Sequence, residues 1–137
     1  MATFNKFNSF VEAVAEKVHN LGSDTLTIAL TAAANAPVAT NTKLSDLTQI
    51  SYTNLSSRVI TTTSSSQTSG TYKLVLQDLT LTASGTVADF RYVVIYNDTA
   101  TNDELIGWYD YGSTVSLTSG DSLVIDFDGS SGALTIT

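Results

Sequence analysis

The sequence predicts an all-β fold, a jelly-roll-like β-sandwich of eight or nine short strands with one N-terminal amphipathic helix. Beyond Gly22, apolar side chains alternate with polar ones at a period of two, which is typical of half-buried strands. Gly, Asn, Asp and Ser separate these stretches at intervals of mostly about 8–12 residues, the spacing expected for a sandwich. Thr and Ser supply 39 of the 137 residues and charged side chains only 14%, so hydroxyl groups stand where many domains carry charges.

The length and composition predict one domain, residues 1–137, with a helix or arm over 1–22 and the sandwich over 23–137. The sequence has no Cys, so packing, strand hydrogen bonds or partner subunits have to stabilise it. It also lacks an apolar run of the roughly 18 residues that predict a transmembrane span. The N-terminus lacks the apolar segment of a secretory signal, and we expect a protein made and kept in a cytosol.

The N-terminal residues predict an amphipathic helix of about four turns. Ser9 and Glu12 are spaced as a capping box near its start, and Gly22 stands where a glycine ends a helix. The apolar stripe consists of Phe7, Phe10, Val11, Val14, Val18 and Leu21. Such a stripe has to be covered, either by the protein's own sandwich or by a neighbouring subunit.

The first half of the sandwich begins with a strand over 26–30. Leu26, Ile28 and Leu30 alternate with Thr, which predicts one buried face. The segments that follow are interpreted, in order, as a surface loop over 32–43, a helical turn over 44–50, a short strand near Tyr52, a strand over 58–63 and a loop over 64–70.

The second half is centred on 90–96, nearly continuous in β-branched and aromatic residues, which predicts a strand buried on both faces. Before it, the alternation changes phase at Gln77–Asp78, so either a β-bulge lies there or two strands face different sheets. The strands on either side of this change are expected over 72–76 and 79–83. The remaining predictions are a loop over 97–104, a returning strand over 105–111, and strands over 115–117, 123–127 and 134–136.

The net charge of −7 lies entirely in the last third of the sequence. Residues 1–91 hold six acidic and six basic side chains, whereas residues 92–137 hold seven carboxylates and no base. We interpret these carboxylates as a means of solubility and of protecting strand edges from pairing. The alternative is an outward face of an assembly, or a patch for a basic partner. Because the chain is this acidic, we do not expect nucleic acid as a partner.

No metal or cofactor site is predicted. His19, the sole histidine, lies beside the polar face of the expected helix and is interpreted as a solvated surface side chain, because a triad or a zinc site would need partners. The turn Asp126-Phe127-Asp128-Gly129 begins like a calcium loop, but no further carboxylate follows, so we interpret it as a hairpin turn. The oxygen-rich loop over 97–104 is interpreted as solvated, with a bound cation as the alternative.

Catalysis is not predicted, and no catalytic residue is assigned. Asp103, Glu104 and Asp110 are the carboxylates from which a glycosidase pair could be imagined. The first two are adjacent in a polar loop, however, where neither burial nor spacing tunes them for acid–base work.

Aromatic side chains are concentrated in the strand over 105–111. Strand alternation places Trp108 with Ile106 on one face and Tyr109 with Tyr111 on the other. We interpret one face as core and the other as an intersubunit surface, with a stacking platform for sugars as the alternative. Together with the N-terminal aromatic residues, the candidate interface comprises Phe4, Phe7, Phe10, Trp108, Tyr109 and Tyr111.

The most distinctive stretches are FRYVVIYNDT at 90–99, LIGWYDYG at 105–112 and VIDFDG at 124–129, with FNKFN at 4–8. Together they resemble small structural proteins of tailed-bacteriophage virions, and among these the capsid decoration, or cement, proteins. The resemblance is one of pattern over most of the chain and includes no catalytic signature. It implies a β-sandwich subunit, a homotrimer, that binds the major capsid protein at junctions of the shell.

On this resemblance we expect a non-catalytic virion protein, made in the host cytoplasm and located on the capsid surface. It would stabilise the head by multivalent contacts, without a cofactor and without nucleic acid or membrane as a partner. The first alternative is a receptor- or carbohydrate-binding module of a phage tail fibre or spike, which would use the aromatic platform. The second is a small glycan-active enzyme that would use the three carboxylates named above.

Overall fold

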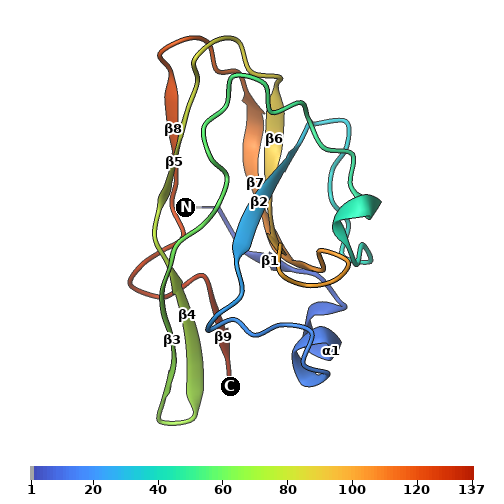
Figure 1. The fold of residues 1–137 in the computed structure, drawn as a ribbon, viewed down its shortest axis with the longest axis vertical. Helices are drawn as coiled ribbons and strands as arrows, with labels where there is room; N and C mark the ends of the chain where they lie inside the picture. Colours follow the sequence, from blue (N-terminus) through green and yellow to red (C-terminus); the bar gives the residue numbers. More distant parts are fainter. Residues whose placement is uncertain (1) are drawn as a thin grey trace.

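The computed structural model describes residues 2–137, which form a β-sandwich (Figure 1). The elements are β1 (Asn5–Lys6), α1 (Phe10–Ala15), β2 (Leu26–Thr31), the 3-10 turn η1 (Leu44–Asp46), β3 (Thr62–Thr68), β4 (Thr71–Leu76), β5 (Leu79–Thr82), β6 (Phe90–Asn97), β7 (Leu105–Val115), β8 (Ser122–Ile125) and β9 (Leu134–Ile136). One layer is an antiparallel sheet with the order β1-β7-β6-β2, and the other consists of two smaller sheets, β3-β4-β9 and β5-β8. The predicted all-β sandwich with one N-terminal helix is confirmed.

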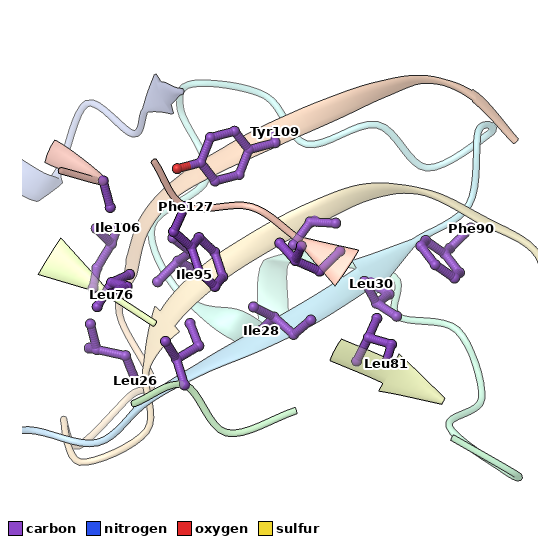
Figure 2. Close-up of a cluster of buried hydrophobic side chains, with 14 of the residues drawn as sticks. Leu26, Ile28, Leu30, Leu76, Leu81, Phe90, Ile95, Ile106, Tyr109 and Phe127 are labelled. Carbon is purple, nitrogen blue, oxygen red and sulfur yellow. The ribbon is translucent and has the colours of Figure 1, made fainter. Parts of the chain in front are cut away.

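The main core lies between the two layers (Figure 2). Ile28 of β2 and Ile95 of β6 pack in one cluster with Leu76 of β4 and Leu81 of β5, and all four are almost fully buried. Phe127, which follows β8, belongs to the same cluster. Each such side chain stabilises the fold by about 1.5–3 kcal/mol through burial of apolar surface, so this core is the main source of stability in a chain without disulfides.

The four-stranded sheet is buried on both faces. Burial of both faces of β6 was predicted and is confirmed, but the prediction of one buried face for β2 is wrong, because all six of its residues are buried. A second cluster covers the outer face, and its members are Phe7, Ala29, Val94, Tyr96 and Leu105. Leu44 and Leu47 pack against it from the loop that carries η1, on the right of Figure 1.

α1 is shorter than predicted, with six residues in place of four turns. Lys17 has a left-handed backbone conformation with φ of 65°, and the N–H of Val18 donates to the carbonyl oxygen of Ala13 at 2.8 Å. This arrangement is a Schellman cap, which glycine usually forms. The predicted helix end at Gly22 is therefore wrong, and so is the capping box, because the Ser9 side chain makes no capping hydrogen bond. Within residues 2–137, no helix has the length and apolar character needed to cross a membrane.

The apolar stripe of the N-terminal segment packs on the protein's own sandwich. Phe10 and Leu21 belong to the main core, and Phe7 belongs to the second cluster. Val11, by contrast, is 56% exposed. Of the two coverings considered for the stripe, the structure shows the intramolecular one.

β3 occupies a segment that was predicted as a loop, so that prediction is wrong. It pairs antiparallel with β4, and Ser69 and Gly70 form the turn with φ of 51° and 84°, as in a two-residue hairpin. The predicted strand over 58–63 is wrong for most of its length, although the N–H of Ile28 donates to the carbonyl oxygen of Arg58 at 3.0 Å. Most β3 side chains are exposed, so no apolar alternation marked the strand.

The observed strand boundaries decide three smaller predictions. The phase change at Gln77–Asp78 separates β4 from β5, which belong to different sheets. The predicted strand near Tyr52 is wrong, because residues 51–54 form a loop. The Tyr52 hydroxyl accepts a hydrogen bond from the Leu30 N–H at 3.0 Å and donates to Gln49 at 2.7 Å, which fixes this loop beside β2. The predicted strand over 115–117 is not separate, because β7 continues to Val115.

Candidate functional site

β7 changes the side on which its residues lie at a β-bulge. Between Leu105 and Gly107, the ladder with β6 advances by one residue on β6 and by two on β7, so Ile106 is the extra residue. An extra residue shifts the alternation of side chains. As a result Ile106 joins the main core, whereas Trp108 packs against the second cluster. The prediction that these two side chains share a face is therefore wrong.

A larger irregularity lies further along β7. Tyr92 of β6 pairs with Asp110, and Phe90 pairs with Val115. Between these two pairs β6 has one residue and β7 has four, residues 111–114, which are all exposed. We call residues 111–114 the β7 bulge. Because its residues outnumber their partners, the ladder leaves them projecting from the sheet.

Arg91 and Asp110 form the base of the β7 bulge. Arg91 donates from Nε to Oδ1 of Asp110 at 2.8 Å and from Nη2 to Oδ2 at 3.0 Å. The N–H of Gly112 donates to Oδ1 at 2.8 Å. The Arg91 hydrogen bond, followed by that of Gly112, holds the pKa of the Asp110 carboxyl below its ordinary value. Asp110 therefore acts as a charged acceptor that shapes the bulge, a state unsuited to a general acid.

An apolar groove of about 180 Å³ lies between the edge of β7 and β8. We call it the β7–β8 groove. Its lining residues are Ala2, Val93, Tyr109, Tyr111, Leu123, Val124, Ile125 and Asp126.

The β7–β8 groove combines exposed apolar side chains with free strand edges. Tyr111 and Val124 are each 55% exposed. Along residues 2–137, β8 pairs with β5 alone, and β1 pairs with β7 only at Gly107 and Trp108. Backbone groups of both strands therefore remain available to a further strand. This combination is typical of a surface that contacts another protein.

The six candidate interface residues lie at different depths: Phe7, Phe10 and Tyr109 are buried, Phe4 and Trp108 are half-buried, and Tyr111 is exposed. The Trp108 ring centroid lies 4.6 Å from that of Phe7, on the side of the second cluster, while Tyr111 lines the groove. The aromatic residues of β7 therefore do not form one stacking platform. Val124 was not among the predicted interface residues, because its only signal in the sequence is an apolar residue between Leu123 and Ile125.

The three carboxylates considered for catalysis are not brought together as an acid–base pair. Burial raises the pKa of Asp103, and the neighbouring Asp98 and Glu104 carboxylates raise it further. Asp110 is instead held in the ion pair on β7. Among residues 2–137, no group of three or more His, Cys, Asp or Glu side chains is placed to hold a metal ion.

The turn that begins like a calcium loop uses its carboxylates internally. Oδ1 of Asp126 accepts the N–H of Asp128 at 2.8 Å. Oδ1 of Asp128 accepts the Ser131 N–H at 3.0 Å and the Ser130 hydroxyl at 2.8 Å. These bonds, the Ser131 N–H first, hold the pKa of Asp128 below its ordinary value. The oxygens thus close the turn itself.

His19 is not the solvated side chain that was predicted. It is 7% exposed, because the chain leaves the helix at Lys17 and the helical wheel no longer describes residue 19. The imidazole centroid lies 5.5 Å from that of the Phe10 ring. Its Nδ1 lies 3.0 Å from Nδ2 of Asn97, a residue with no exposed surface.

The described residues thus present a candidate contact surface, the β7–β8 groove, and a buried polar cluster around His19. Asn97 is the side chain that hydrogen-bonds His19 within residues 2–137, and an amide is not a nucleophile to be activated. Comparison of the chain with protein-family models, with curated proteins and with solved structures gives no match.

Proposed function

We propose that the protein is a non-catalytic structural subunit of a tailed-phage virion, a capsid decoration (cement) protein. In this proposal it is a homotrimer on the capsid surface and binds the major capsid protein. The resemblance of residues 90–99 and 105–112 to such proteins supports the family. The observation that carries the proposal is the β7–β8 groove, where Tyr111 and Val124 are exposed beside two free strand edges.

The groove suits contacts that are weak singly and numerous on a lattice. Burying the exposed parts of Tyr111 and Val124 contributes roughly 25 cal/mol for each Å² of apolar surface removed from water. The free edges of β7 and β8 add backbone hydrogen bonds if the shell protein supplies an extended segment. Contacts repeated around a trimer raise the effective concentration of each further contact. A subunit that binds only the assembled shell stabilises it by mass action.

The charge of the groove favours a basic partner surface. Asp126 lines the groove, and all seven carboxylates that account for the net charge lie beyond residue 91. Complementary charge increases the rate of association and selects the partner more than it adds affinity. A positively charged rim on the shell protein is therefore part of the proposal.

The test is to locate the chain in purified particles. Particles from the natural host lysate are separated into heads and tails, analysed by mass spectrometry and imaged by electron cryomicroscopy. We expect the chain on the head surface, in copies that follow the shell lattice. Its presence in a tail fibre or spike would replace the proposal with the receptor-binding alternative. A free monomer, absent from every particle fraction, would overturn it.

A further inference from the structure

Three side chains from separate segments meet inside the protein. His19 follows α1, Asp24 precedes β2, and Asn97 ends β6. Nδ2 of Asn97 donates to Oδ2 of Asp24 at 2.7 Å and lies 3.0 Å from Nδ1 of His19. Asn97 therefore ties the segment 16–24 to the end of β6, and this amide uses both of its hydrogens to do so.

The orientation of the Asn97 amide is set by its other end. Its Oδ1 accepts hydrogen bonds from the N–H groups of Thr99 at 3.0 Å and Ala100 at 3.1 Å. A reversed amide would place this oxygen against the Asp24 carboxylate, where two acceptors meet, and the NH₂ group against two N–H donors. Both contacts are repulsive, so the amide has the orientation described. Nδ2 consequently presents a hydrogen to His19. Nδ1 of His19 has to accept it, so the ring is neutral and carries its proton on Nε2.

A protonated His19 is incompatible with this contact. An imidazolium carries hydrogen on both nitrogens, and its Nδ1–H would point at an N–H of Asn97. Nε2 is buried and has no hydrogen-bond partner within residues 2–137. The ring is packed against Phe10 of α1, and the charged groups that act on it are Asp24 and Glu104. Both carboxylates favour the charged ring, but burial has the larger effect and lowers the pKa of His19.

We propose that His19, Asn97 and Asp24 form a pH-sensitive latch, in which neutral His19 holds the segment 16–24 on β6 and protonation releases it. This inference is independent of the proposed function. The segment forms one wall of a cleft of about 600 Å³, which β3, β4 and β9 border on the other side. Leu21, buried in the latched state, lines this cleft. Release therefore opens the cleft and exposes an apolar side chain.

The sign of the pH response follows from the lowered pKa. Stability that depends on neutral His19 is fully present above the unfolded value of 6.5 and is lost as the pH falls toward the lower, folded pKa. Over that interval the unfolding equilibrium constant rises by up to about tenfold per pH unit. His19 is the sole histidine, the side chain type whose ordinary pKa lies in this window. Asp103, whose pKa is raised, responds with the opposite sign, because a raised folded pKa of a carboxyl makes the folded state more stable as the pH falls. A loss of stability as the pH falls through this window can thus be assigned to His19.

The test has a spectroscopic and a thermodynamic part, both on the full chain. Nitrogen-15 NMR at pH 7.5 should show a neutral His19 ring with the proton on Nε2. Urea unfolding should show stability falling from pH 7 to pH 5, and amide protection of 18–24 should fall with it. In the variant His19→Asn, an amide oxygen takes the place of Nδ1 and does not titrate, so stability should be level across this range.

Three results would overturn the latch: a proton on Nδ1 of the neutral ring, level stability of the native chain from pH 7 to 5, or an unchanged pH response in His19→Asn. If His19→Asn does not fold, the ring protonation and the pH profile of the native chain still decide the question.

Discussion

Arg91 and Asp110 face each other across β6 and β7 and are joined by two parallel hydrogen bonds of 2.8 and 3.0 Å. They stand at the point where four residues of β7 lie opposite one residue of β6. Both side chains are partly exposed, so solvent screens their attraction and they contribute little to overall stability. Their effect is on shape, because they hold the strand from which Tyr111 projects.

Replacing Asp110 by Asn should loosen the β7 bulge without unfolding the protein. The amide keeps one acceptor for Gly112 but loses the charge and the paired contact with Arg91. We expect a small decrease in Tm and a clear decrease in NMR order parameters over 111–114. Arg91→Lys should have the same effect, since lysine lacks the planar fork. Unchanged order in both variants would show that the ion pair does not set the bulge.

Replacing Tyr111 by Ser should weaken binding to phage heads, if the groove is the contact surface. The side chain is largely exposed, so the free energy of unfolding should change by less than about 0.5 kcal/mol. Every bound subunit loses the same contact, so the decreases in binding strength multiply over the lattice. The amount of variant protein retained on sedimented heads should therefore fall by about tenfold or more. Val38→Ser, at a residue 52% exposed in the loop before η1, is the matched control and should bind normally. Equal binding of Tyr111→Ser and Val38→Ser to phage heads would exclude the β7–β8 groove as the contact surface.

Replacing Gly107 by Ala should destabilise the N-terminal segment. A Cβ there would collide with the ring of Phe4 and lie 2.8 Å from the carbonyl oxygen of Asn5. β1 would have to move, at a cost of roughly 1–3 kcal/mol, measured by urea unfolding. Gly129→Ala is the control, because an added Cβ meets no atom within 4 Å. Equal stability of the two variants would contradict the close packing of β1 on β7.

Tyr109 should make the protein sensitive to alkali. Burial, with the charges of Asp126 and Asp128, raises its pKa to about 12, from an ordinary value of 10.0. A raised folded pKa means that the stabilisation is complete below pH 10 and is lost as the pH rises toward 12, by about 2–3 kcal/mol. Urea unfolding between pH 8 and 12 should show this loss in the native chain and a smaller one in Tyr109→Phe. An equal loss of stability with pH in the native chain and in Tyr109→Phe would contradict the raised pKa of Tyr109.

The parts of the fold that could be predicted from sequence are the strands that bury large apolar side chains, on one face or on both. The stretch 90–96 is continuous in apolar residues because β6 is covered on both faces. β2 is covered on both faces too, but Ala29 and the threonines beside it carry little apolar signal, so its outer burial was missed. β3 was missed for the opposite reason, since its Ser and Thr side chains are mostly exposed and leave no alternation.

The composition of the candidate site depends on bulges and backbone conformations that the alternation of apolar and polar residues in the sequence does not record. Tyr111 was among the predicted interface residues, but its exposure comes from surplus residues in β7, and Ile106 shifts the alternation without any sequence mark. The burial of His19 follows from a left-handed backbone at Lys17, a conformation for which glycine, not lysine, is the usual signal. Pairing partners and backbone handedness, which arise only in the folded chain, decided these outcomes.

The second cluster restricts how copies of this protein can be arranged. Phe7, Leu44 and Leu47 cover part of the outer side of the four-stranded sheet, so another sheet that stacked on this side would meet these side chains instead of the strands. Neighbours that use strand backbone have to approach along the rim, in the plane of the layers. If the proposed function holds, subunits joined through these edges lie side by side, with their sandwiches in one layer.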